Sequence, residues 1–437
     1  MLVMGSMIGS GIFIVSAGMS RDLGSVENLL LAWVLTGVLT LLGALSYAEL
    51  GAAMPKAGGQ YVYLKEAYGK LFGFLYGWTL FTVIQTGTIA AVGVAFAKFT
   101  GVLFPVISEH NILFELGKFH ISTVQVLGIL VVWLLTLSNF REVKHGAFVQ
   151  NLFTLSKIIA LLFVIVAGFY FVVNSPNIQW HFNRSNIGFS QIGIGVFSAA
   201  LVGSIFSSDA WNNITFTAGE IEKPEKNLPR SLLLGTGGVT LLYLMSNLVY
   251  VNALPLDSIK NAEFDRVGTL LMQTVFGPVG SVLMALLIMV STFGCINGLT
   301  LSGARVYYAM AHDGYFLKQA AVLNKNHSPQ KALTMQALWA SVLTLSGSYG
   351  DLLDYVVFAV LLFYILTVAA VFVLRKKQPD LVRPYQVFAY PFVPALYILM
   401  ASVICISLLI YKPDYSYPGL AIVLAGVPVY YWIQKKN

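Results

Sequence analysis

Long apolar stretches separated by short polar loops run along the whole chain of 437 residues. A helix needs about 20 apolar residues to cross the hydrocarbon core of a bilayer. We predict a membrane-spanning helix from each of twelve such stretches, several of which are long enough to require tilting. The stretches are residues 1–19, 29–52, 70–101, 121–139, 146–173, 188–218, 229–253, 279–311, 330–347, 352–374, 387–411 and 416–433.

Residues 264–277 form a shorter apolar stretch that ends at Gly277-Pro278, and we expect a surface helix there. The twelve long stretches are continuous rather than alternating, which excludes a transmembrane β-barrel. Composition agrees, because 57% of the residues are hydrophobic and 10% are charged, whereas soluble domains have about 25% charged residues. With a mean hydropathy of +0.77, the chain is expected to be an all-α polytopic membrane protein.

The net charge of +7 comes from 26 lysine and arginine residues, most of which lie in short loops. Seventeen fall in loops on one side of the predicted membrane, six on the other, and three within or at the ends of spans. Basic loops face the cytoplasm in multi-pass proteins. We therefore expect a cell-membrane protein with both termini in the cytoplasm, and no binding of nucleic acid.

The chain shows no motif of an enzyme or of a metal site. HExxH, P-loop and G-x-S-x-G patterns are absent, so we expect no enzyme activity and no cofactor. Cys295 and Cys405 lie in apolar stretches, where neither a disulfide framework nor a metal cluster is expected. The first stretch lacks the basic flank of a signal peptide. Because the chain begins inside that stretch, we expect a polar tail and the first turns of helix 1 to precede Met1.

A cluster of small residues interrupts the first apolar stretch. Gly and Ser occupy five of the eight positions from Met4 to Gly11. Such a helix breaks easily, and broken backbone at membrane depth is tolerated only inside the protein or along a cavity. In transporters these breaks bind substrate, because the N–H groups that start a half-helix attract a carboxylate. Close helix packing is the structural alternative for so many small residues.

The sixth apolar stretch repeats this peculiarity. Residues 203–213, Gly-Ser-Ile-Phe-Ser-Ser-Asp-Ala-Trp-Asn-Asn, interrupt it with small and polar side chains. Helices 1 and 6 are each the first of five, one running outward and the other inward, so the two five-helix units would be inverted copies. Interrupted helices at matching positions of two inverted halves indicate a transporter binding site.

Four motifs resemble the amino acid–polyamine–organocation (APC) superfamily, and the resemblance covers nearly the whole chain. They are residues 5–13 in helix 1, Pro55-Lys-Ala-Gly-Gly-Gln-Tyr-Val-Tyr after helix 2, Glu220-Ile-Glu-Lys-Pro-Glu-Lys-Asn-Leu-Pro-Arg230 after helix 6, and Asn297-Gly298 followed by Arg305 in helix 8. Within the superfamily, the chain is similar to the L-type amino acid transporter branch, including its bacterial serine/threonine and alanine–serine–cysteine exchangers.

This resemblance implies a LeuT-like fold with a 5+5 inverted repeat. A single transporter domain, residues 1–437, would contain a first repeat at 1–174, a second at 188–374 and two further helices at 387–433. It also implies alternating access and sodium-independent exchange of neutral L-amino acids such as Ala, Ser, Cys and Thr. Proton-coupled symport and a transporter-like amino acid sensor are the alternative functions.

We expect the substrate carboxylate at the helix 1 break. Backbone N–H groups would bind it there, and two serine hydroxyls could add donors. The residues are Ser6, Ile8, Gly9, Ser10 and Gly11.

The substrate ammonium would lie at the helix 6 break, against carbonyls at the end of the outer half-helix. The candidate residues are Ser204, Ile205, Phe206 and Ser208. Phe206 resembles the family's gate aromatic, although core packing is its ordinary role. Asp209 either caps the inner half-helix or faces the cavity and influences substrate charge. The chain departs from the branch at Ser207-Ser208, which replaces a bulkier pair, and at Ala210, where Gly is common.

Lys157 lies eleven residues after Gly146, the predicted cytoplasmic start of helix 5. At roughly 1.5 Å per residue it is about 16 Å deep, so it should face the interior of the bundle. The resemblance places it beside helices 1 and 8, where sodium-coupled relatives hold a sodium ion, and a fixed ammonium there implies sodium independence. Alternatively, burial could let it release a proton, or it could simply bond helix 1 carbonyls.

Tyr243 and Asn297 are further gating candidates in helices 7 and 8, although each could simply bond a neighbouring helix. The eukaryotic members of the L-type branch join a glycoprotein through a cysteine between helices 3 and 4. Residues 102–120 contain no cysteine. The chain therefore resembles a bacterial stand-alone form with no disulfide-linked heavy subunit, whose partners are L-amino acids and the lipid bilayer.

Overall fold

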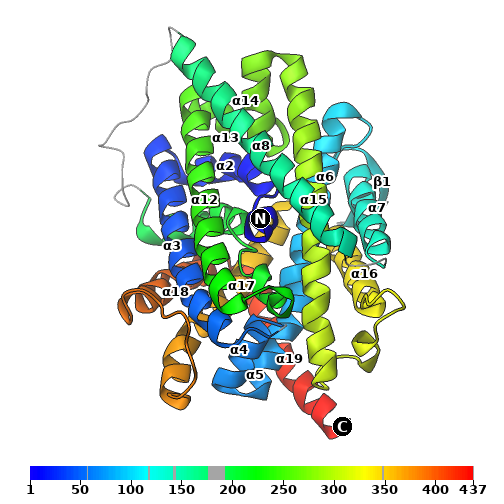
Figure 1. Ribbon diagram of the computed structural model, residues 1–437. Coiled ribbons are helices and arrows are strands. Elements are labelled where there is room, and N and C mark those ends of the chain that lie inside the picture. Colours follow the sequence, from blue (N-terminus) through cyan, green and yellow to red (C-terminus); the bar gives the residue numbers. More distant parts are fainter. Residues whose placement is uncertain (57, 117–118, 141–143, 176–191, 347–348, 437) are drawn as a thin grey trace.

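The computed structural model describes residues 1–436 except 57, 117–118, 141–143, 176–191 and 347–348. Almost all of the described elements are helices, and the longest run between the two ends of the molecule (Figure 1).

Eight helices in the described part are long and apolar enough to cross a membrane. They correspond to α3 (Val26–Ala53), the run of α5 (Lys70–Thr79), η1 (Leu80–Ile84) and α6 (Gln85–Leu103), α8 (Lys144–Asn174), α12 (Pro224–Ala253), α15 (Pro278–His312), α17 (Tyr349–Lys377), α18 (Phe392–Tyr411) and α19 (Pro413–Lys436). The chain is therefore a multi-pass membrane protein, as its composition predicts.

The remaining predicted spans coincide with shorter elements. They are α1 (Leu2–Met7) with α2 (Gly11–Leu23), α7 (Thr123–Ser138), α9 (Ile194–Ala200) with α10 (Val202–Ser207), and α16 (Gln330–Ser346). The helix expected at 264–277 is α14 (Val267–Phe276), and it ends directly before Gly277-Pro278, as predicted. A total of twelve membrane crossings and the inverted repeat stay predictions.

The described part of the chain is mostly helical, as expected, but one loop contains a short β-hairpin that the sequence did not predict. Between α6 and α7, strand β1 (Ile112–Leu116) pairs antiparallel with β2 (Phe119–Ser122). Strand β2 alternates apolar and polar residues, a short signal that the long apolar stretches on either side obscure. Two further helices lie in the loops, α4 (Gln60–Tyr68) and α13 (Leu256–Lys260).

Two groups of helices surround α1. In one group α3 packs along α12 and α2 packs against α10; in the other α6 packs along α15 and α7, and α16 covers α6 and α7. Helix α1 contacts α12, α8 and α15, and it lies near the centre of the view in Figure 1. The predicted helix 1 is thus enclosed by helices rather than exposed to lipid.

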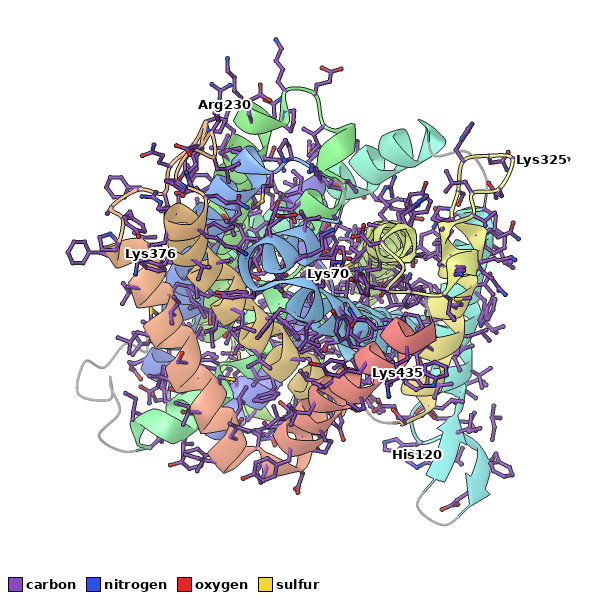
Figure 2. All side chains as sticks on the ribbon, turned by 90° about the horizontal axis from the view of Figure 1, so that it is seen from below. Lys70, His120, Arg230, Lys325, Lys376 and Lys435 are labelled. Carbon is purple, nitrogen blue, oxygen red and sulfur yellow. The ribbon has the colours of Figure 1, made fainter. Side chains whose placement is uncertain are left out.

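One end of the molecule, which we call the basic end, carries several lysine and arginine residues. Figure 2 looks onto this end and labels Lys70, Arg230, Lys325, Lys376 and Lys435. Helices α4 and α5 and the C-terminus also lie there (Figure 1). All five residues belong to the loops or chain end that the charge count assigns to the cytoplasm.

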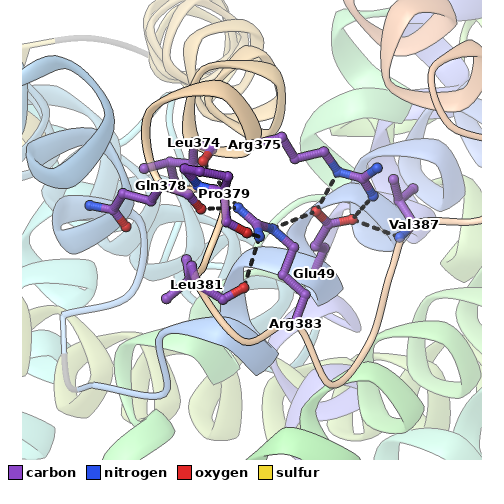
Figure 3. A network of polar contacts seen from close by, with 8 residues as sticks. All are labelled: Glu49, Leu374, Arg375, Gln378, Pro379, Leu381, Arg383 and Val387. Atoms are coloured by element: carbon purple, nitrogen blue, oxygen red, sulfur yellow. Dashed lines mark hydrogen bonds and ion pairs between the residues drawn. The ribbon is translucent and has the colours of Figure 1, made fainter.

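A buried carboxylate organises the backbone at the basic end (Figure 3). Glu49 of α3 is 2% exposed and accepts two hydrogen bonds from Arg375, at 2.7 and 2.9 Å. It also accepts the backbone N–H of Val387 at 2.8 Å and lies 3.6 Å from the Arg383 guanidinium. Arg383 in turn donates to the Leu374 carbonyl in the last turn of α17 and to three carbonyls just after that helix. This network joins α3 to the loop that precedes α18.

Candidate functional site

The helix 1 break lies between α1 and α2. Helix α1 ends at Met7, and Ile8 has extended backbone angles of φ −73° and ψ 97°. Helix α2 begins at Gly11, so residues 8–10 are the non-helical segment. This break falls within the segment where the cluster of small residues predicts it.

Side chains from three other helices approach the carbonyls at the end of α1. A helix leaves its last four carbonyl groups without partners in the helix, and inside a membrane these must be satisfied by other groups. The contacts are Lys157 Nζ to Gly5 O at 2.7 Å, Cys295 Sγ to Ser6 O at 3.6 Å, Tyr243 Oη to Met7 O at 3.0 Å, and Ser291 Oγ to Ile8 O at 3.4 Å.

Lys157 makes the strongest of these contacts. Its side chain is 1% exposed, and its ammonium donates a charge-assisted hydrogen bond to the Gly5 carbonyl. The negative end of the α1 dipole also favours a cation at this place. Sequence reasoning identified this lysine from its depth, whereas nothing in the sequence predicted the contact of Cys295, since a small side chain within an apolar helix looks the same whatever it touches.

The first turn of α2 faces the break from the other side. The N–H groups that begin an α-helix have no partner within it, and the dipole makes this end favourable for an anion. Ser10 occupies the cap position before Gly11, and Phe13 N–H donates back to the Ser10 carbonyl at 3.0 Å. The side chains of Ser6, Ile8 and Ser10 are all buried. The break therefore offers a carboxylate backbone donors in a dry environment.

Helix 6 is broken as well. Helix α10 ends at Ser207, residues 208–212 are non-helical, and α11 (Asn213–Phe216) follows. Ala210 adopts the left-handed region with φ +64°, a conformation that costs a residue other than glycine about 1–2 kcal/mol. The place where the branch commonly has glycine is thus a backbone position that suits glycine best.

The end of α10 presents carbonyl groups to this second break. Ser208 N–H donates to the carbonyls of Ser204 and Ile205, at 3.0 and 3.1 Å. Each carbonyl retains a second lone pair for another donor. The Ser204 hydroxyl is not available at the break, because it bonds Thr36 of α3 at 2.7 Å and the Leu201 carbonyl. Phe206 is buried at the last turn of α10.

The two breaks touch each other. A Cβ atom placed on Gly11 would lie 2.2 Å from Ser207 Oγ and 3.0 Å from its Cα, so only glycine allows this approach of α2 to α10. The Tyr243 hydroxyl lies 3.0 Å from Met7 O and 3.1 Å from Ser207 O, and thus bridges both broken helices. We call the contact of Gly11 with Ser207, bridged by Tyr243, the junction of the two broken helices. Tyr243, predicted as a gating candidate, is therefore part of this junction.

Asp209 does not cap α11, whose cap position is Asn212. Its carboxylate instead accepts a hydrogen bond from the Tyr364 hydroxyl of α17 at 2.5 Å. Asp209 and Tyr364 line a cavity whose space for water-sized molecules is about 20 Å³, room for about one water. Asp209 therefore lies at this small cavity, and an influence of Asp209 on substrate charge stays a prediction.

A polar chain and an aromatic cluster lie next to this cavity. Asn212 donates to Gln60 Oε1 at 3.0 Å, and Gln60 donates to Thr367 of α17 at 2.9 Å. The rings of Tyr47 and Trp211 meet edge-to-face, with centroids 4.8 Å apart. These contacts hold α4, α3 and α17 against the inner side of the helix 6 break. Gln60 belongs to the motif that begins at Pro55, for which the sequence alone predicted no role.

Asn297 lies outside the junction of the two breaks. Its amide oxygen accepts a hydrogen bond from Asn139 at the end of α7, at 2.8 Å. This contact ties α15 to α7, which agrees with the alternative that Asn297 bonds a neighbouring helix. Among the described residues, no group of three His, Cys, Asp or Glu side chains is arranged to hold a metal ion.

A second contact at the basic end involves Asp313, which directly follows α15. Asp313 accepts hydrogen bonds from Lys65 at 2.6 Å and Tyr61 at 2.7 Å, both on α4. Partial burial raises the pKa of this carboxyl, but the hydrogen bonds from Lys65 and Tyr61 outweigh burial and hold the pKa below its ordinary value. The Asp313 carboxylate thus fastens α4 to the end of α15.

Comparison with known proteins places this geometry in context. A family model described as amino acid permease matches residues 1–432. The serine/threonine exchanger SteT of Bacillus subtilis (strain 168) is 34% identical, over 100% of this chain and 95% of its own length. The large neutral amino acids transporter small subunit 2 of Mus musculus is 32% identical, over 99% and 80%. The b(0,+)-type amino acid transporter 1 of Mus musculus is 28% identical, over 99% and 85%. These matches confirm the resemblance to the APC superfamily and its L-type branch.

Proposed function

Because this chain belongs to the amino acid permease family, in which its relatives transport amino acids, we propose that it is a sodium-independent exchanger of neutral L-amino acids. The observation that carries the proposal is the junction of two broken helices at Gly11 and Ser207, bridged by Tyr243. A site with N–H donors on one side and carbonyl acceptors on the other complements the carboxylate and ammonium of one amino acid.

In this proposal the substrate carboxylate binds at residues 8–11, and its ammonium binds the carbonyls that end α10, beneath Phe206. Small side chains such as those of Ala, Ser, Cys and Thr suit a junction this tightly packed. Lys157 supplies a fixed positive charge at the end of α1, where an ammonium makes a bound sodium ion unnecessary. This one site would open to the two sides of the membrane in turn.

Proton-coupled symport is the second candidate, and the full burial of Lys157 favours it. In this candidate mechanism Lys157 releases and regains a proton during each transport cycle. Release of that proton would weaken its hold on the Gly5 carbonyl and so link proton movement to the helix 1 break. We also propose that the chain works without a disulfide-linked partner, since Cys295 and Cys405 are both buried.

Transport into proteoliposomes tests these proposals. Uptake of radiolabelled L-alanine, L-serine and L-leucine is measured in sodium-free buffer without a pH gradient, with and without unlabelled amino acid inside. Uptake only into preloaded vesicles is the expected result and identifies obligatory exchange. Uptake into empty vesicles that grows with an inward proton gradient would replace exchange by symport. Binding without any uptake would identify an amino acid sensor.

A further inference from the structure

A hollow lies near the end of the molecule opposite the basic end, the end at which α13 and α14 are seen in Figure 1. Its volume is about 420 Å³, within the range of small-molecule pockets. The end of α6, the connection to the hairpin, the start of α7 and the turn before α14 form its walls. We call this space the outer hollow. None of the residues in its walls belongs to the junction of the two broken helices.

The walls of this outer hollow carry both signs of charge. Lys98 Nζ lies 3.0 Å from the Glu109 carboxylate, and the two side chains are 9% and 35% exposed. Arg266 lies 3.2 Å from Glu263, with exposures of 10% and 79%. The two cations are thus held in the wall, while the two carboxylates reach solvent. Such a lining has no net charge and suits a ligand that also carries one charge of each sign.

An aromatic side chain packs against two residues of this wall. The Phe264 ring lies 5.3 Å from the His110 ring and 4.9 Å from the Arg266 guanidinium carbon. Phe264 and the next residue, Asp265, both have left-handed backbone angles, with φ of +52° and +63°. Two successive residues in this region are uncommon, and backbone strain of this kind gathers at ligand clamps and switches.

The same turn contacts α2, the helix that follows the helix 1 break. Asp265 accepts a hydrogen bond from Arg21, at the end of α2, at 2.8 Å. Gly268, three residues after Asp265, lies so close to α2 that a Cβ there would be 3.0 Å from the Phe13 ring. A ligand that holds Phe264 would therefore also constrain α2, whose first turn forms one side of the junction.

We propose that the outer hollow is a second, weaker binding site for the amino acid substrate in its zwitterionic form. The substrate carboxylate pairs with Arg266 and Lys98, and its ammonium pairs with Glu109. Occupation of the site would reach the junction through the Phe264-Asp265 turn and α2. This inference rests on the proposed function for the identity of its ligand, but it concerns residues that the exchange mechanism does not use.

Protection of an introduced thiol tests the site. Ser108, a partly exposed residue of the wall, is replaced in Ser108→Cys, and Lys260→Cys on α13 serves as a control outside the wall. Labelling by a thiol reagent is timed with and without L-alanine, propionate or propylamine. We expect L-alanine to slow labelling at position 108 several-fold, the other two compounds to have little effect, and position 260 to be unaffected.

A second pair of variants separates this site from the junction. Adding Arg266→Gln to Ser108→Cys should abolish protection while amino acid exchange continues, whereas adding Lys260→Gln should leave protection intact. Protection that persists with Arg266→Gln, equal protection by propionate, or no protection in a protein that exchanges amino acids would each overturn the proposal. Protection by L-alanine in a protein that exchanges nothing would instead overturn the proposed function and leave the outer site standing.

Discussion

At the scale of single residues, Lys157 illustrates how burial turns an ordinary side chain into a constraint on function. Its ammonium has given up water and gains a carbonyl at the end of a helix in return. A buried charge without such a partner would cost several kcal/mol. The hydrogen bond between Lys157 and the Gly5 carbonyl therefore stabilises both the buried charge and the end of α1.

We predict that Lys157→Ala lowers the exchange rate by about tenfold or more while the protein still inserts in the membrane. Hydrogen bonds to charged groups contribute about 1.5–3 kcal/mol, and each 1.4 kcal/mol corresponds to a factor of about ten. Initial rates of alanine exchange in proteoliposomes, normalised to incorporated protein, measure the effect. Lys318→Ala, at an exposed position near the basic end, is the control. Unchanged rates and apparent affinities for Lys157→Ala would remove the lysine from the mechanism.

Asp313 gives a prediction about acid stability. Because its pKa is below the ordinary value of about 3.9, its contacts with α4 add stability above that pH and lose it as the pH falls through the lowered pKa. The melting temperature of the native protein should therefore exceed that of Asp313→Asn at pH 6, and the difference should shrink towards pH 3. Lys65→Gln, which removes one donor, should show a smaller difference of the same sign. A difference that stays constant with pH would contradict this assignment.

At the scale of elements, sequence composition identified both helix breaks but not the contacts around them. Runs of Gly, Ser and Asp lower helix stability locally, so their position is visible in the chain itself. The partners of the freed carbonyls, such as Ser291 and Cys295, lie on a distant helix, and nothing local distinguishes a serine that bonds its own helix from one that reaches across. The depth of Lys157 could be counted because one helix has a fixed rise.

The crossing of α2 and α10 gives a prediction with a control in the same helix. Gly11→Ala would place a methyl group 2.2 Å from Ser207 Oγ and 3.0 Å from its backbone, so the two broken helices must move apart. Overpacking of this kind costs about 1–3 kcal/mol, and we expect exchange to fall by at least about tenfold. In Gly18→Ala the new methyl group would meet only Arg21, at 3.6 Å. This control should keep nearly native rates and melting temperature, and equal behaviour of the two variants would refute the close crossing.

At the scale of the whole molecule, four of the packed helix pairs each join a helix from the first half of the chain to one from the second half. Helix α2 packs on α10, α3 on α12, α6 on α15 and α7 on α16. Such pairs are what an inverted repeat would produce, which stays a prediction. The order of the long apolar stretches could be read from hydropathy because the bilayer demands a minimum length. The contacts of the loops at the basic end could not be predicted from hydropathy, because tertiary packing determines which residues these loops contact.

The network around Glu49 raises the question of whether it opens during transport (Figure 3). Three donors satisfy this carboxylate, which is 2% exposed, and the Arg375 guanidinium also stacks 3.8 Å from the Tyr390 ring. Removing one partner of a buried ion pair costs about 3–5 kcal/mol, a large fraction of the stability of a typical domain. A contact of this strength is better suited to stay closed throughout the cycle, so that the end of α3 and the loop before α18 move as one body.

Glu49→Gln should therefore reduce stability more than it changes the rate of exchange. Glutamine keeps the size of the side chain and can still accept the Val387 N–H, but it loses the charge that pairs with Arg375. Because glutamine keeps part of the hydrogen bonding and Arg375 is 23% exposed, we expect a loss of about 1–3 kcal/mol, less than for removal of a whole partner from a fully buried pair. The melting temperature of the purified protein should fall by several degrees, while the maximal exchange rate changes less than about threefold. Glu66→Gln on α4, a carboxylate for which the described residues show no ion pair, should alter neither. If Glu49→Gln instead raised the exchange rate with little loss of melting temperature, the network would be a gate that opens in each cycle, because only a contact broken during transport can limit its rate.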